Sequence, residues 1–151
     1  MELARGFMNE EKMQDSLSPL ILAVEDNEDN LLLMSYALES IGCRLICQQD
    51  SFSTVLLAKE HQPDLILLDV LLPGLSGIDI VKLLKREPLT YKIPVIAVTA
   101  LAAAEDQERI LFAGFDDYIS KPFMIEDLEL KIHHHLNKKL NPHTNLNLCL
   151  E

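Results

Sequence analysis

Cysteine is scarce in this chain of 151 residues, and Cys43, Cys47 and Cys149 follow no spacing typical of a zinc site. An odd number of cysteines at such positions indicates free thiols, as in proteins of a reducing compartment. No apolar run approaches the roughly 18 residues that a membrane span needs. Residues 1–19 also lack the basic-then-apolar order of a signal peptide. These absences predict a cytoplasmic protein without membrane attachment.

Basic residues are few as well, since 13 Lys and Arg stand against 24 Asp and Glu, a formal net charge of −11 at pH 7. This surplus of negative charge repels the phosphate backbone of nucleic acids, so we expect no nucleic-acid binding. Hydrophobic residues make up 48% of the chain and charged residues 25%, which is typical of a globular protein rather than a disordered one. The length suits one domain.

Five short apolar runs are present, and each suits a strand buried on both faces of a parallel sheet. They are Leu20–Val24, Cys43–Cys47, Leu65–Leu68, Val95–Val98 and Tyr118–Ile119. Segments with apolar residues at helical spacing follow each run. Five strand–helix repeats in about 120 residues predict an α/β fold, a doubly wound five-stranded parallel sheet with helices on both faces. We expect its strands in the flavodoxin-like order 2-1-3-4-5.

Glycine, serine and proline residues predict where several of the helices begin and end. Gly42 and Gly114 are expected to close the first and fourth helices. The second helix is expected to begin near Ser51, and the third to end before Pro88. The apolar stripe of the fifth helix consists of Ile125, Leu128, Ile132 and Leu136.

The predicted domain spans residues 19–137, between a flexible leader at residues 1–18 and a tail at residues 138–151. In the tail, Leu146, Leu148 and Leu150 alternate with less apolar residues, a two-residue period. Two interpretations stay open for it: a loosely ordered tail, or a strand added to a partner or to another copy of the chain.

Polar residues stand where the predicted strands end. Glu25 and Asp26 follow the first strand, Asp69 the third, Thr99 the fourth and Lys121 the fifth. In open α/β sheets, ligands bind at the carboxyl ends of the strands where the strand order reverses, here between the first and third strands. The three carboxylates should therefore converge on one small basin.

Three converging carboxylates repel one another unless a cation joins them. Oxygen ligands suit a hard divalent ion, and Mg²⁺ binds through one or two carboxylates together with water and phosphate oxygens. One carboxylate can then attack a phosphoryl group and form an aspartyl phosphate. Thr99 can donate its hydroxyl to a phosphoryl oxygen, and Lys121 can pair with the negative charge. Chance placement of acidic residues is the alternative, and the agreement of five positions argues against it.

Four segments of the chain resemble the receiver domain of bacterial two-component response regulators. They are AVEDN at 23–27, LLDVLLPGLSG at 67–77, VTA at 98–100 and YISKPF at 118–123. The resemblance covers about residues 19–137 and carries the family's functional positions in order and at suitable spacing. Its specificity comes from the set of motifs rather than from any one of them.

The resemblance implies that Asp69 accepts a phosphoryl group from a phosphohistidine, carried by a sensor histidine kinase or a histidine phosphotransfer protein. Asp26 would bind Mg²⁺ directly and Glu25 through water. Asp69 and the backbone carbonyl of Leu71 would complete the protein ligands, and Lys121 would contact the phosphoryl group. The peptide bond that follows Lys121 precedes proline and is expected to be cis.

The resemblance also implies a switch. Thr99 would move toward the phosphoryl group on activation, and Tyr118 would follow it inward. The face made by the fourth helix, the fifth strand and the fifth helix would then rearrange and contact a downstream protein target. Whether that face also forms a homodimer stays open, and Tyr118 as a plain core aromatic is the alternative to its switch role.

Other polar residues near these motifs have simpler interpretations. Glu28 and Asp29 fit the start of a helix, where negative charge is favourable. Pro73 and Gly77 fit a turn whose backbone shape matters. Three consecutive histidines, 133–135, point about 100° apart on a helix and cannot converge on one metal ion. The last of them falls on the apolar stripe and should be half-buried.

Leu71 lies two residues after Asp69, and Leu101 lies two residues after Thr99. Many members of the family have a polar residue at one of these positions. Both flank the path of an attacking water in the family's geometry. Our hypothesis is that these apolar neighbours make the phosphorylated state long-lived.

The sequence therefore favours a stand-alone, phosphorylation-dependent signalling switch, not an enzyme beyond its own phosphorylation and dephosphorylation. One alternative is a phosphotransferase or phosphatase with Asp69 as nucleophile, which would need a second acid close behind, where Leu71 stands. The other is a receiver-like scaffold that is never phosphorylated, and the complete set of polar residues at the strand ends argues against it.

Overall fold

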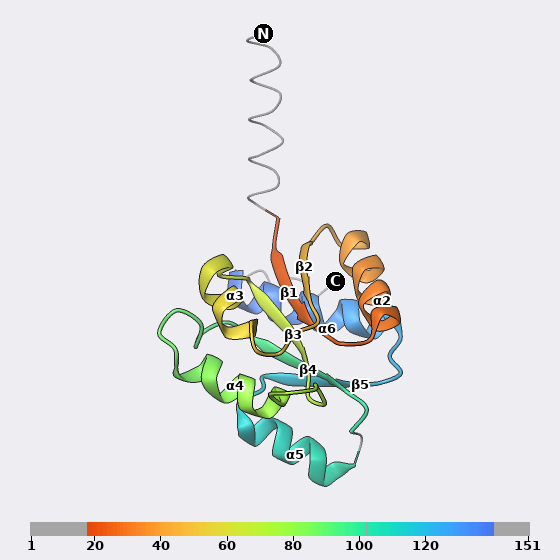
Figure 1. The fold of residues 1–151 in the computed structure, drawn as a ribbon. Coiled ribbons are helices and arrows are strands. Elements are labelled where there is room, and N and C mark those ends of the chain that lie inside the picture. Colours follow the sequence, from red (N-terminus) through yellow and green to blue (C-terminus); the bar gives the residue numbers. More distant parts are fainter. Residues whose placement is uncertain (1–17, 102, 141–151) are drawn as a thin grey trace, which may run out of the picture.

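A parallel sheet of five strands lies at the centre of the computed structural model, which describes residues 18–101 and 103–140 (Figure 1). The strands are β1 (Leu20–Val24), β2 (Arg44–Gln48), β3 (Leu65–Asp69), β4 (Val95–Thr99) and β5 (Asp117–Ser120). Their order is β2-β1-β3-β4-β5, and all four neighbouring pairs are parallel. The predicted fold class and strand order are confirmed.

Helices cover both faces of this sheet (Figure 1). They are α2 (Glu28–Ser40), α3 (Thr54–His61), α4 (Gly77–Arg86), α5 (Ala104–Ala113) and α6 (Ile125–Leu140). The buried side chains of α2 and α6 pack against one face, and those of α3, α4 and α5 against the other. Such double winding follows from strand–helix–strand connections that alternate between the two faces of the sheet.

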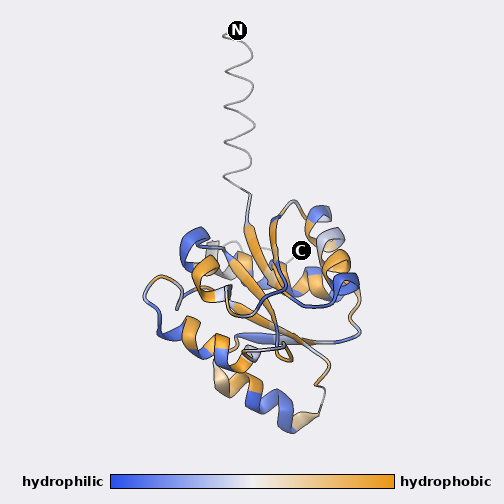
Figure 2. Cartoon of the chain, viewed as in Figure 1, coloured by the Kyte–Doolittle hydropathy of each residue, from blue (hydrophilic) through white to orange (hydrophobic). Residues whose placement is uncertain are grey.

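The three middle strands form the core, and Figure 2 shows them as hydrophobic along their length. Every residue of β3 and β4 is buried, and so are the last four of β1. The expectation of strands buried on both faces holds there but not for β2 and β5, whose residues are mostly half-buried or exposed. Those two strands lie at the edges of the sheet, where one side has no neighbouring strand to cover it.

Local signals explain most of the helix boundaries. Gly42, two residues after the end of α2, and Gly114, directly after the end of α5, have φ of +74° and +124°, as predicted, since glycine adopts this conformation without steric cost. Helix α4 ends at Arg86, before Pro88. Helix α3 begins at Thr54 and not near Ser51, because the Asp50 carboxylate accepts hydrogen bonds from the residues that follow it and forms a turn first.

Cys43, just before β2, and Cys47, within it, are free thiols, as predicted, and Cys149 lies outside the described residues. Helix α6 continues past position 137, where the sequence predicts the domain to end. The predicted leader up to residue 17 and the alternating leucines of the tail also lie outside the described residues. No helix in the described part of the chain is both long and apolar enough to cross a membrane.

A carboxylate at the start of β5 ties that strand to α6. Asp117 Oδ1 accepts hydrogen bonds from Lys131 Nζ at 2.8 Å and from the backbone N–H of Tyr118 at 2.8 Å. His135 Nε2 lies 2.9 Å from Asp117 Oδ2, with its side chain 11% exposed, so this histidine is half-buried as predicted. Burial acts to raise the pKa of Asp117, but hydrogen bonds from Lys131 and His135 outweigh it and lower that pKa.

The Asp117 network should contribute pH-dependent stability. Because the pKa of Asp117 is lower in the folded chain than its ordinary value of 3.8, its ionised form stabilises the fold above that value and ceases to do so as the pH falls below it. Asp117→Asn should therefore lower the free energy of unfolding by about 1 kcal/mol at neutral pH. In urea titrations, the difference from the native chain should shrink as the pH is taken below 3.8.

Asp106→Asn is the matched control, because Asp106 is paired only loosely, with Arg109 Nη2 at 3.8 Å from its Oδ1. Its unfolding free energy should stay within about 0.5 kcal/mol of the native value at neutral pH. A difference between Asp117→Asn and the native chain that does not change with pH would argue against an electrostatic role for this carboxylate.

Candidate functional site

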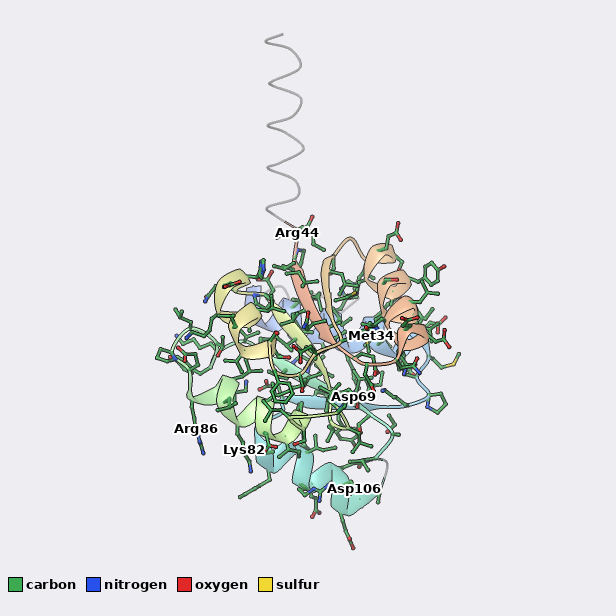
Figure 3. All side chains as sticks on the ribbon, in the orientation of Figure 1. Met34, Arg44, Asp69, Lys82, Arg86 and Asp106 are labelled. Atoms are coloured by element: carbon green, nitrogen blue, oxygen red, sulfur yellow. The ribbon has the colours of Figure 1, made fainter. Side chains whose placement is uncertain are left out.

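Three carboxylates meet at the carboxyl ends of the adjacent strands β1 and β3. One oxygen each from Glu25, Asp26 and Asp69 lies within 4.8 Å of the others. Asp69 is the last residue of β3, and Figure 3 shows it at that end of the strand. Glu25 and Asp26 directly follow β1, which pairs with β3 in parallel register. The convergence predicted from the strand order is therefore present in the structure.

Lys121 supplies positive charge between two of these carboxylates. Its Nζ donates to Asp69 Oδ2 at 2.9 Å and also forms an ion pair with Glu25 Oε1. Lys121 directly follows β5, and its backbone N–H donates to the carbonyl of Thr99 at 2.7 Å, which joins the ends of β4 and β5. The Lys121–Pro122 peptide bond is cis, as predicted.

Glu25 is completely buried, and polar groups surround it on more than one side. Its Oε2 accepts the backbone N–H of Asn27 at 3.2 Å, and its Oε1 accepts the side-chain amide of Asn30 at 3.3 Å. Burial raises the pKa of Glu25, the hydrogen bond from Lys121 opposes that rise, and the neighbouring charge of Asp69 adds to it. Burial of Glu25 therefore makes its charge costly, and the ion pair with Lys121 offsets part of that cost.

The pKa of Lys121 is shifted in the direction that keeps the side chain charged. Burial acts to lower this pKa, but hydrogen bonds to Glu25 and Asp69 and their negative charges outweigh it, so the pKa rises above its ordinary value. Lys121 is therefore a fixed ammonium ion at neutral pH, with a side chain only 17% exposed.

Asp69 is held in one orientation by two donors. Its Oδ2 accepts from Lys121, and its Oδ1 accepts the backbone N–H of Leu71 at 3.0 Å. Helix α4 begins tightly against this strand end, because the backbone N–H of Gly77 donates to the carbonyl of Val70 at 2.9 Å. A Cβ on Gly77 would lie only 2.7 Å from the Cα of Val70, so this position requires glycine because the two backbone segments approach closely.

The two predicted switch residues, Thr99 and Tyr118, lie on the neighbouring strands β4 and β5. Thr99 is buried at the end of β4, and its Oγ1 accepts the backbone N–H of Leu101 at 3.1 Å. Tyr118 lies on β5 and packs half-buried against the core cluster beneath α3, α4 and α5. The Nζ of Lys131 lies 5.7 Å from the centre of its ring.

Several residues near the site have the simpler places that the sequence suggested. Glu28 and Asp29 are exposed in the first turn of α2, where negative charge favours the helix dipole. Asn27 caps this helix, since its Oδ1 accepts the backbone N–H of Asn30 at 2.9 Å. The support that Asn27 and Asn30 give to Glu25 was not predicted. Their spacing of three residues at a helix start is the signal that could have indicated it.

The donor set fits a magnesium ion. All side-chain donors of the cluster are carboxylate oxygens, the ligands that Mg²⁺ prefers. Glu25 and Asp69 are almost fully buried, and Lys121 brings a single positive charge to the three acids. A divalent cation would neutralise the remaining charge, which burial otherwise makes unfavourable. Glu25, Asp26 and Asp69 are therefore the residues that could hold such an ion.

Comparison with known proteins points to one family. The family model described as the response regulator receiver domain matches residues 21–133 of this chain. Among curated proteins, the polar-differentiation response regulator DivK of Brucella anthropi is 44% identical over 105 residues, which cover 70% of this chain and 85% of that protein. The protein of the same name from Brucella ovis matches with the same identity and coverage.

Solved structures agree with this assignment. The receiver domain of a sensor histidine kinase from Pseudomonas aeruginosa PAO1 is 32% identical, with a TM-score of 0.74, and the match covers 80% of this chain and 98% of that one. That structure has a magnesium ion coordinated in its active-site cleft. The receiver domain of a histidine kinase from Syntrophus aciditrophicus is 31% identical, with a TM-score of 0.76 and coverage of 82% and 94%.

Magnesium should stabilise the fold through the carboxylate cluster. At a Mg²⁺ concentration about ten times its Kd, the native chain should gain about 1.4 kcal/mol in unfolding free energy. Asp26→Asn removes one exposed ligand, so Mg²⁺ should raise the melting temperature of this variant far less. With a chelator present, the variant should be at least as stable as the native chain, because one of three repelling charges is gone.

Asp29→Asn removes an exposed acid that lies outside the cluster and serves as the control. Its melting temperature should respond to Mg²⁺ as the native one does. Equal responses of Asp26→Asn and the native chain in differential scanning calorimetry would contradict a metal site at these residues.

Proposed function

Because this chain belongs to the family of response regulator receiver domains, we propose that it is a phosphorylation-dependent signalling switch whose phosphoacceptor is Asp69. The observation that carries the proposal is the orientation of Asp69 at the carboxyl end of the central strand β3, beside the ammonium group of Lys121 and two further carboxylates. The upstream donor would be the phosphohistidine of a sensor histidine kinase or a histidine phosphotransfer protein.

In the proposed reaction, a carboxylate oxygen of Asp69 attacks the phosphorus atom of the phosphohistidine. The bond between phosphorus and the donor's imidazole nitrogen breaks, that nitrogen keeps the bonding pair, and an aspartyl phosphate forms. Lys121 pairs with the negative phosphoryl oxygens, and the hydroxyl of Thr99 donates to one of them. Asp26, Asp69 and the carbonyl of Leu71 would hold Mg²⁺ directly and Glu25 through water, and the bound ion would neutralise more of that charge.

The signal would leave the site through the face formed by α5, β5 and α6. The buried hydroxyl of Thr99 now accepts from Leu101, and turning it toward a phosphoryl group would vacate space next to β5. Tyr118 is half-buried on that strand and could move into this space. A local change of charge would thereby alter the surface seen by a protein partner.

A pocket on the same face supports the proposal that a protein partner binds there. It has a volume of about 420 Å³ and lies along β5 and α6. Its lining residues are Asp117, Tyr118, Ile119, Ser120, Asp127, Leu130 and Lys131. An inward movement of Tyr118 would change the shape of this pocket, so the downstream partner, either a target protein or a second copy of the chain, would bind the two states with different affinity.

Phosphorylation of Asp69 can be tested without the natural donor. Incubation with acetyl phosphate and Mg²⁺ should add one phosphoryl group to the native chain, detected by intact mass spectrometry. Asp69→Asn and native protein in chelator should gain none, whereas Asp29→Asn should be labelled like the native chain because it lies outside the cluster. Undiminished labelling of Asp69→Asn would refute Asp69 as acceptor, and turnover of a small phosphoester would favour an enzyme.

The lifetime of the phosphorylated state should depend on Leu71 and Leu101. Leu71 is 55% exposed and Leu101 half-buried beside Thr99, so polar side chains there could hydrogen-bond a water that attacks the aspartyl phosphate. In a phosphate-release time course, Leu71→Asn and Leu101→Lys should each release phosphate faster. A gain of roughly tenfold corresponds to about 1.4 kcal/mol in the barrier.

Leu32→Asn is the matched control, because Leu32 is exposed to a similar degree, 53%, on α2. It should release phosphate at the native rate. Equal rates for the native chain and both test variants would mean that these leucines do not restrain hydrolysis.

A further inference from the structure

Ser51 is a buried serine between β2 and α3, and its hydroxyl bridges to the loop that follows β3. Ser51 is only 2% exposed. The Oγ donates to the carbonyl of Pro73 at 2.9 Å and accepts the backbone N–H of Leu75 at 3.1 Å. One hydroxyl thus satisfies a backbone donor and a backbone acceptor of a different loop, 22 and 24 residues away in the sequence.

The two loops also fit closely together at Gly74, which lies between the two bonded backbone groups. Gly74 has φ of +86°, and a Cβ on it would lie 2.5 Å from Phe52 Cε2 and 3.2 Å from Ser51 Oγ. No side chain fits between Gly74 and this pair, so Ser51 and Phe52 together cover the middle of the loop.

This loop, residues 70–76, carries the carbonyl of Leu71, which is the proposed backbone ligand of Mg²⁺. Its start is fixed by the hydrogen bond from Leu71 N–H to Asp69, and its end by the bond from Gly77 N–H to the carbonyl of Val70. Neither of these bonds fixes the residues between them, and the bridge from Ser51 attaches there.

A shift at Ser51 would be passed to Leu71 across only one intervening residue. Leu72 is 8% exposed, so its packed side chain has little room to turn, and Pro73 has a fixed φ. This short segment has few torsions that could absorb the displacement before it reaches the Leu71 carbonyl. The position of that oxygen is therefore coupled to the bridge.

The bridge itself is held by the turn before α3. Asp50 Oδ1 accepts the backbone N–H of Phe52 at 2.9 Å, and the backbone N–H of Thr54 donates to the carbonyl of Ser51 at 3.3 Å. Ser51 is thus oriented by bonds within its own turn, and such ordering lowers the cost of assembling a metal site.

We infer that Ser51 is a positioning residue for the metal site: through Pro73 and Leu75 it sets the place of the Leu71 carbonyl and so the affinity for Mg²⁺. The inference rests on the proposed function, since that function makes the Leu71 carbonyl a ligand. Residues that orient a metal ligand commonly change affinity by about 10- to 100-fold when they are replaced.

Isothermal titration of the chain with MgCl₂ tests this inference directly. Ser51→Ala should raise the Kd for Mg²⁺ by about tenfold, the lower end of that range, because the bridge acts on one ligand only. Ser51→Thr keeps the hydroxyl and should keep the Kd within about twofold of the native value. Ser53→Ala removes a neighbouring hydroxyl that bonds Asp50 and not the loop, and it should also stay near the native Kd.

Two further readouts separate positioning from general damage. In metal-free protein, amide hydrogen exchange at Leu75 should accelerate in Ser51→Ala and not in Ser53→Ala, because only the former loses the acceptor of that N–H. Phosphorylation by acetyl phosphate should need more Mg²⁺ in Ser51→Ala but reach the native rate at saturating Mg²⁺. If Ser51→Ala does not fold, Ser51→Cys, of similar size and a weaker donor, takes its place.

The outcomes distinguish this inference from the proposed function. A native chain that binds Mg²⁺ and is phosphorylated, together with an unchanged Kd in folded Ser51→Ala, would overturn the inference alone. An equal rise of the Kd in Ser53→Ala, with hydrogen exchange at Leu75 unchanged in that variant, would overturn it as well, because the effect would then not pass through the bridge. A native chain that neither binds Mg²⁺ nor is phosphorylated would overturn both.

Discussion

Concentrated negative charge at the carboxyl ends of β1 and β3 is the constraint on which the rest of the structure depends. Glu25 and Asp69 are buried side by side, Asp26 lies at the rim, and Lys121 opposes them with one positive charge. Burial of unbalanced charge is costly, so the folded chain is prepared for a cation and for any change that redistributes this charge. The proposed switch depends on this imbalance, because phosphorylation of Asp69 would change the charge that Lys121 and the ion must balance.

The sheet makes this concentration possible and also connects it to a distant surface. Parallel strands bring all their carboxyl ends to the same end of the sheet. Residues that follow or end β1, β3, β4 and β5 therefore meet although they lie far apart in the sequence. Thr99 and Lys121 are joined there by a backbone hydrogen bond, and β5 is tied in turn to α6 by Asp117. A displacement at the site therefore has a short path of packed and bonded groups to the face that a partner would contact.

Much of this arrangement was predictable because it depends on local patterns. Short apolar runs give the strands, and their order places Glu25, Asp26 and Asp69 together. Predictions failed where a side chain interacts with a segment far away in the sequence. The sequence predicts a helix start near Ser51, whereas Asp50 forms a turn there. In that turn, the hydroxyl of Ser51 bonds Pro73 and Leu75. Likewise, the expected strand order places β2 and β5 at the edges of the sheet, but their short apolar runs alone indicate burial on both faces, which the assembled sheet does not provide there.

The central claim is that a change of charge at Asp69 alters the conformation of the face formed by α5, β5 and α6. Amide spectra of isotope-labelled protein, recorded by NMR with Mg²⁺ before and after addition of beryllofluoride as a phosphoryl mimic, test it most directly. The account predicts shifts at Thr99 and Lys121 that continue through Tyr118 into α5 and α6, with none of them in Asp69→Asn. Shifts confined to the residues around Asp69, with Tyr118 and both helices unchanged, would contradict it.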